Sequence, residues 1–242
     1  MLSESILTEY MNCFYGYGSY GAAYWFVGTE EYSTITRAEF ELRLDVWNAR
    51  GKRELEDIQG YHIAIGKQGY FAANAVLNKT WDKLIQVLFR MENLNGTREQ
   101  RRAYQKIQLA RDNKVCLLDL LPLPRPGGTF WEYNQWSNAP SLADRKAYKT
   151  FVLLERKKHL AERIQAHHPR AVIFYGQKYR EHWEEIARSR FAVTFDGYES
   201  ARVDATWFFL IKHPIAQGLT NEYFKGVGRF IADKLCSAKQ LH

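Results

Sequence analysis

The sequence alternates short, almost wholly apolar runs with longer stretches in which apolar residues recur every three or four positions. Each apolar run ends in glycine, proline or a polar residue. Runs of this length are typical of strands buried on both faces, as in a parallel sheet. The four runs are AAYWFVG at 22–28, KVCLLDLLPL at 114–123, RAVIFYG at 170–176 and TWFFLIKHP at 206–214.

Helical patterns fill much of the chain between these runs. The segment NKTWDKLIQVLFRM at 78–91 places its apolar side chains on one face of a helix. Ser141 is positioned to cap a long helix that ends before Pro169. Similar helical patterns occupy 177–189 and 221–235.

This alternation of strands and helices predicts an α/β fold. We expect a three-layer sandwich with a mostly parallel, four-stranded central sheet. The length of 242 residues and the 46% of hydrophobic residues suit one folded domain over 1–242. The net charge of +7 favours a polyanionic partner such as nucleic acid, acidic lipid or a phosphorylated ligand, although a solvated basic surface is the simpler alternative.

The positions of the cysteines and the lengths of the apolar runs exclude further classes of protein. Cys13, Cys116 and Cys236 are far apart and form no CxxC pair, so neither a disulfide framework nor a four-cysteine metal site is expected. We expect no cofactor and no metal. No signal peptide is recognisable, and no apolar run approaches the roughly 20 residues of a membrane span. We therefore expect a cytoplasmic monomer without a membrane partner.

In parallel sheets the working residues lie beyond the carboxyl ends of the strands. That rule selects Glu30, Glu31 and Tyr32 after the first run, Asp119 at the second and His213 after the fourth. Each has an ordinary alternative: a glutamate that caps a helix, an aspartate that caps a turn, or a histidine in a loop.

Four short motifs, taken in order, give a resemblance. They are GTEEY at 28–32, LLD at 117–119, FYG at 174–176 and HP at 213–214. In this order and spacing the chain resembles the uracil-DNA glycosylase superfamily over residues 20–235, with a divergent stretch at about 33–66. The glycine-rich GYGSYG precedes the first run, so a nucleotide-binding enzyme is disfavoured.

The resemblance implies a DNA glycosylase that flips a base out of the helix and hydrolyses its N-glycosidic bond. The departing base is anionic and the sugar has cationic character. By position, the carboxylate of Glu30 stabilises the sugar and orients water, and His213 hydrogen-bonds the base. Glu31 stands where the family has a proline and is the second candidate for the carboxylate. No lysine stands out as a Schiff-base nucleophile, so a monofunctional enzyme is expected.

Asp119 differs from the asparagine with which uracil-specific relatives read the base. An ionised aspartate only accepts hydrogen bonds, so it favours an exocyclic amine, as on cytosine. Plain cytosine is normal DNA, so a modified cytosine is expected. The superfamily includes an antiviral defence enzyme that removes glucosylated hydroxymethylcytosine from phage DNA. The family's tyrosine at Tyr32 blocks bulk at C5, so Tyr32 must be displaced if such a base is admitted.

Further positions follow from the resemblance. Phe71, or its neighbour Tyr70, is expected to stack on the flipped base. The loop 124–137 carries Trp131 and Trp136, which are expected to contact the modification.

DNA contacts are expected near the end of the chain. Gln217, or nearby Leu219, is placed to fill the vacated stack. Lys225 and Arg229, with the backbone N–H groups of two nearby glycines, are placed to hold phosphates. The alternative for these glycines is close helix packing. The basic segment ERKKHLAER at 155–163 is expected to be a solvated helix face.

Two other functions remain open at this point. One is a uracil-DNA glycosylase of base excision repair, which would tolerate Asp119. The other is a relative that binds single- or double-stranded DNA without catalysis, which the altered GTEEY motif permits.

Overall fold

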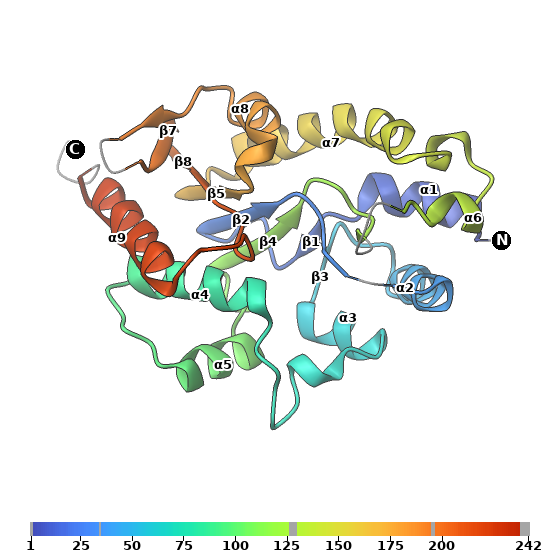
Figure 1. Ribbon diagram of the computed structural model, residues 1–242, viewed down its shortest axis with the longest axis horizontal. Helices are drawn as coiled ribbons and strands as arrows, with labels where there is room; N and C mark the ends of the chain where they lie inside the picture. Colours follow the sequence, from blue (N-terminus) through green and yellow to red (C-terminus); the bar gives the residue numbers. More distant parts are fainter. Residues whose placement is uncertain (1, 34, 126–129, 195–196, 238–242) are drawn as a thin grey trace.

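The computed structural model describes residues 2–33, 35–125, 130–194 and 197–237. Its centre is an eight-stranded mixed sheet with the order β3-β1-β4-β2-β5-β8-β7-β6 (Figure 1). The four apolar runs form the middle of this sheet as neighbouring parallel strands, β4 (Val115–Asp119), β2 (Tyr24–Gly28), β5 (Ala171–Tyr175) and β8 (Thr206–Ile211).

The α/β class is therefore confirmed, but the prediction of a four-stranded, mostly parallel sheet is wrong. Two strands extend each side of the parallel centre, and both inner ones run antiparallel to their central neighbours. Three of the four are only two residues long, too short to show a sequence period. The added strands are β1 (Gly16–Tyr17), β3 (Leu55–Glu56), β6 (Ala192–Val193) and β7 (Glu199–Val203).

Helices cover both faces of the sheet, and α7 and α8 lie on the face opposite α4 and α9 (Figure 1). The helices are α1 (Glu4–Cys13), α2 (Arg37–Ala49), α3 (Ile58–Ala64), α4 (Lys79–Met91), α5 (Arg98–Ile107), α6 (Tyr133–Trp136), α7 (Arg145–His167), α8 (Arg180–Ala187) and α9 (Asn221–Ser237), with short 3₁₀ turns at Gln68–Tyr70, Pro140–Leu142 and Gln177–Tyr179.

Alternating side chains of the central strands build two cores. In β2, Trp25 and Val27 pack in the core that includes α7 and α8, whereas Tyr24 and Phe26 pack in the core that includes α4 and α9. Because a core covers each face of the sheet, side chains that point to either face are buried and must be apolar. This explains why the central strands are continuous apolar runs.

Helix α7 begins three residues later than predicted. Asp144, not Ser141, is its N-cap, and the Asp144 carboxylate accepts a hydrogen bond from the backbone N–H of Ala147 at 2.7 Å. The helix ends at His168, whose backbone is left-handed. The start matters because it fixes Arg145 in the first turn of α7, at the edge of the sheet described next.

Candidate active site at the carboxyl edge of the sheet

The parallel strands bring the predicted polar residues to one edge. Gly28, which ends β2, is the register partner of Asp119, which ends β4. Tyr175 at the end of β5 is paired with Ile211, two residues before His213. Glu30 and Glu31 follow Gly28 directly. The carboxyl ends of four neighbouring strands therefore present three carboxyl groups, a tyrosine and a histidine along one edge.

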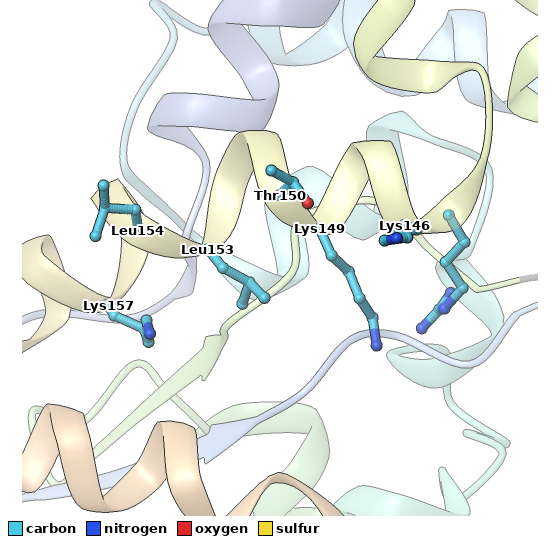
Figure 2. A pocket seen from close by; sticks show the side chains of 7 residues that line it. Lys146, Lys149, Thr150, Leu153, Leu154 and Lys157 are labelled. Atoms are coloured by element: carbon cyan, nitrogen blue, oxygen red, sulfur yellow. The ribbon is translucent and has the colours of Figure 1, made fainter.

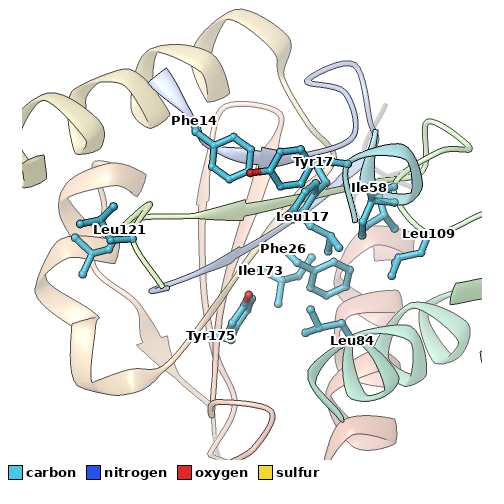
Figure 3. Packing of buried hydrophobic residues seen from close by; sticks show 14 of the residues in the cluster. Phe14, Tyr17, Phe26, Ile58, Leu84, Leu109, Leu117, Leu121, Ile173 and Tyr175 are labelled. Atoms are coloured by element: carbon cyan, nitrogen blue, oxygen red, sulfur yellow. The ribbon is translucent and has the colours of Figure 1, made fainter. Parts of the chain in front are cut away.

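Gly28 makes room for Tyr175 at the centre of this edge. A Cβ atom at Gly28 would lie 2.2 Å from both Cζ and Oη of Tyr175, so any side chain there would displace the ring. The Tyr175 ring is 5.5 Å from the His213 ring at an angle of 68°. Figure 3 shows Tyr175 beside Phe26 and Ile173 in the buried cluster. Tyr175 thus joins the core to the candidate site.

Glu30 is held by an arginine from far along the chain. Nη2 of Arg145 lies 2.6 Å and 2.7 Å from its two carboxylate oxygens. The Glu30 side chain is 7% exposed and that of Arg145 is 27% exposed. The pair fixes the carboxylate at the mouth of β2 and leaves the guanidinium in reach of solvent.

Glu31 points to a different arginine. Nη1 and Nη2 of Arg43 in α2 donate to its two oxygens at 2.6 Å and 2.8 Å, which is a bidentate pair. Burial opposes ionisation of Glu31, but the charge and hydrogen bonds of Arg43 outweigh it and lower the pKa of Glu31. The Arg43 side chain is only 3% exposed. Glu31 therefore neutralises the buried charge of Arg43, as expected for a structural ion pair.

The third carboxyl group at this edge is that of Asp119. Within the described residues, its carboxylate accepts no hydrogen bond, whereas its backbone carbonyl accepts one from Arg156. Burial, and then the negative charges of Glu31 and Glu30, raise the pKa of Asp119 to about 7, against the opposing charge of Arg156. Asp119 can therefore donate or accept a hydrogen bond near neutral pH.

His213 is oriented by its own loop. The backbone N–H of Ile215 donates to Nδ1 of His213 at 3.4 Å. Burial lowers the pKa of His213 below its usual value, so the ring is neutral at neutral pH. With Nδ1 as acceptor, the proton of the neutral ring lies on Nε2, which makes Nε2 a hydrogen-bond donor.

Of the aromatic residues expected to contact the base, two are packed against other rings and one is exposed. Phe71 is 5% exposed, and its ring packs 5.8 Å from His62 and 6.1 Å from Trp81. Tyr70 packs against the same two residues. Tyr32 is 59% exposed, and its backbone forms a bridge with Arg125. The predicted stacking residues thus belong to a packed cluster, and Tyr32 faces solvent.

The two tryptophans of the loop 124–137 also serve the core. Nε1 of Trp131 donates to the carbonyl of Leu142 at 2.8 Å, and its ring packs on Tyr133 and Tyr148. Trp136 is 8% exposed and packs on Tyr133 and Phe40. Residues 126–129 of this loop, including both of its glycines, lie outside the described residues.

The backbone part of the phosphate site expected in α9 is contradicted by the position of its two glycines. Gly226 and Gly228 lie inside the helix, where backbone N–H groups bond to carbonyls one turn earlier. A Cβ at Gly228 would lie 2.5 Å from the carbonyl oxygen of Val87 in α4, so the alternative of close helix packing is confirmed for this glycine. Gln217 and Arg229 are exposed, Leu219 packs partly on the core, and Lys225 pairs with Glu222 at 2.6 Å.

The segment 155–163 is not wholly solvated either. Arg156 is fully buried, and it donates to the backbone carbonyls of Leu120, Met11 and Asp119 at 2.7–3.1 Å. Its guanidinium also lies 3.8 Å from the ring centre of Tyr15. Arg156 therefore donates hydrogen bonds to backbone carbonyls at the end of β4, including that of Asp119.

Sequence reasoning missed Arg43, Arg145, Tyr175 and His62. The partners of the two glutamates come from separate helices, and no local pattern links them. His62 is 4% exposed, donates from Nδ1 to the carbonyl of Ile58 at 2.7 Å, and has its pKa lowered by burial to about 4. The one sequence signal for Arg145 was its place near the start of a predicted helix, and this signal is weak.

A comparison with models of known protein families finds no match to this chain, and a comparison with curated proteins finds no matching sequence. In the described parts of the chain, no three histidine, cysteine, aspartate or glutamate side chains are grouped to hold a metal ion. None of the helices in these ranges has the length and apolar character needed to cross a bilayer.

Proposed function

We propose that this protein is a monofunctional DNA glycosylase that hydrolyses the N-glycosidic bond of a flipped, modified cytosine-type base. The observation that carries the proposal is the set of strand ends in which Glu30 and Asp119 lie on the same edge as the neutral His213. Breaking the bond requires negative charge near the sugar and a hydrogen-bond donor near the departing base. This edge offers both kinds of group.

Glu30 is assigned to the sugar in this proposal. Its carboxylate stabilises the cationic sugar and positions the attacking water. Arg145 holds it in one orientation, as a preorganised site requires. Glu31 is the weaker candidate because it neutralises the buried guanidinium of Arg43, whereas the arginine that holds Glu30 is partly exposed.

His213 is assigned to the departing base. Its Nε2–H donates to the base oxygen on which negative charge accumulates as the bond breaks. A neutral donor suits this role because its proton is fixed by the N–H of Ile215 on the other ring nitrogen.

Asp119 is assigned to the group at position 4 of the base. In its ionised form it accepts from an amine and repels an oxygen, which favours cytosine-type bases. A modified cytosine remains the preferred substrate because plain cytosine is normal DNA, and removal of such a base would suit defence against phage.

The pKa of about 7 supports a second candidate substrate. In its protonated form Asp119 donates to an oxygen as an asparagine amide does. Uracil, the substrate of repair enzymes in the family that the sequence resembles, is therefore the alternative below neutral pH.

Release of free base, and of alkali-sensitive abasic sites, tests the proposal. The substrates are oligonucleotides with uracil, cytosine, 5-hydroxymethylcytosine or glucosylated 5-hydroxymethylcytosine, compared for the wild type and Glu30→Gln. Release of a modified cytosine by the wild type, lost in Glu30→Gln, is the expected result. DNA binding without release of any base would overturn catalysis and leave a DNA-binding protein.

A further inference from the structure

A basic groove runs along α7. Its cavity has a volume of about 540 Å³ and is lined by residues of this one helix. Figure 2 shows the side chains of Lys146, Lys149 and Lys157 along the helix, with Leu153 between Lys149 and Lys157 and Leu154 pointing to the other side of the helix. Such a surface combines positive charge with apolar contact area.

Two of the cations in this groove are not neutralised. Lys157 pairs with Glu185, and Arg145 pairs with Glu30. Lys146 is exposed and Lys149 is half-buried, and neither forms an ion pair within the described part of the chain. The Lys149 ammonium lies 4.8 Å from the ring centre of Tyr179, which leaves its charge available to a ligand.

The groove begins at the candidate active site. Arg145 lines the groove and also holds the carboxylate of Glu30. From Arg145 to Lys157, α7 rises by about 18 Å at 1.5 Å per residue. This length corresponds to roughly five stacked nucleotides at about 3.4 Å each. A strand whose target base reached the sheet edge would therefore have its neighbouring phosphates within reach of α7.

We propose that the α7 groove binds the sugar–phosphate backbone of the DNA strand that carries the target base. The inference rests on the proposed function and adds the surface that holds the substrate. Lys146 and Lys149 contact phosphates as point charges. Leu153, which lies between Lys149 and Lys157, provides an apolar surface for sugars.

The test compares two charge-reversal variants with the same change in net charge. Lys146→Glu with Lys149→Glu removes the free cations of the groove. The control, Lys158→Glu with Arg98→Glu, changes two exposed residues outside it, one of them on the same helix. Binding of a fluorescently labelled single strand is measured by anisotropy from low to moderate salt, and thermal melting verifies that both variants fold.

The groove variant is expected to bind at least tenfold more weakly. The magnitude of the negative slope of log affinity against log salt is expected to decrease by about 1.4, or 0.7 per lost phosphate contact. The control is expected to keep both values close to the wild type. Equal weakening in both variants would assign the effect to net charge and overturn the groove. Competition by polyglutamate as strong as by unlabelled DNA would also overturn it, because the site would then accept any polyanion.

Failure of the groove and failure of the glycosylase are distinguishable. Loss of binding in the groove variant, with no base released by the wild type, would support the groove and refute the glycosylase. Release of base by a groove variant that binds like the wild type would do the opposite.

Discussion

Nη2 of Arg145 contacts both carboxylate oxygens of Glu30, at 2.6 Å and 2.7 Å, across 115 residues of sequence. A second pair, Arg43 with Glu31, lies directly beside it. The two pairs differ in burial, because the Arg145 side chain is 27% exposed and that of Arg43 is 3% exposed. Under the proposed function, this difference between the two arginines is the reason to assign the chemistry to Glu30 and a structural role to Glu31.

Glu30→Gln is expected to reduce base release by two to four orders of magnitude, the usual range for a group that acts on a proton or a developing charge. Its effect on the free energy of unfolding is expected to be about 1 kcal/mol or less, because water can solvate the guanidinium of Arg145. Single-turnover base release and chemical denaturation measure the two effects. Full activity in Glu30→Gln would remove Glu30 from the mechanism.

Glu31→Gln is expected to show the opposite pattern. The buried guanidinium of Arg43 loses its partner, and breaking a buried pair costs about 3–5 kcal/mol. The lower end of that range applies because the Glu31 side chain is 37% exposed. Base release per folded molecule should stay within a fewfold of the wild type. A stable but inactive Glu31→Gln protein would instead make Glu31 the catalytic carboxylate.

The raised pKa of Asp119 predicts that base preference changes with pH. Above a pH of about 7 the ionised carboxylate repels an oxygen at position 4 of the base. Below it the protonated form can donate to an oxygen or accept from an amine at that position. The ratio of cytosine-type to uracil release should therefore rise as pH increases through about 7. Asp119→Asn should make this ratio independent of pH in the same range. A pH-dependent ratio that persists in Asp119→Asn would assign the effect to another group.

The sequence was sufficient to predict the parts of the fold that depend on local pattern. All four central strands were visible as apolar runs, because each is buried by a strand on both sides and by a core on both faces. The outer strands were not, since a pair of residues such as Gly16–Tyr17 has no period and is a strand only because β4 lies beside it. Tertiary context, not propensity, defines such edges.

The residues of the candidate site were also predicted only in part. Glu30, Asp119 and His213 were predicted because parallel strand ends must share an edge. The role of Phe71 was inferred from the resemblance and that of Trp136 from residue type in a loop, and both rings pack in the core. Residue type alone does not distinguish an aromatic ring that is available to a ligand from one that is packed.

Two buried groups are expected to give opposite slopes of stability with pH. Burial lowers the pKa of His62 from 6.5 to about 4, so the unfolded chain binds more protons and stability falls as pH drops from about 6.5 to 4. The pKa of Asp119 is raised from 3.8 to about 7, so the folded chain binds more protons and stability falls as pH rises from about 4 to 7. The two effects, on the order of 3 and 4 kcal/mol, largely cancel between pH 4 and 6.5.

Single substitutions should reveal each slope. Urea unfolding of Asp119→Asn should show stability that rises from pH 4 to 6.5, and His62→Gln should show stability that falls over the same range. The double variant should be nearly flat. A wild type and an Asp119→Asn protein with equal slopes would contradict the raised pKa of Asp119.

Gly28→Ala is expected to disturb both stability and activity through one contact. The new Cβ would lie 2.2 Å from Cζ of Tyr175, so the ring must move within a packed core, at a cost of about 1–3 kcal/mol. Because the Tyr175 ring also contacts His213, base release should fall together with stability.

Gly69→Ala is the matched control, since a Cβ there has no neighbour within 4 Å. If the contact is the cause, Tyr175→Leu should reduce the destabilisation by Gly28→Ala by at least 1 kcal/mol in a double-mutant cycle, within the range expected for residues in contact. Additive effects in that cycle would show that Gly28 acts through another neighbour.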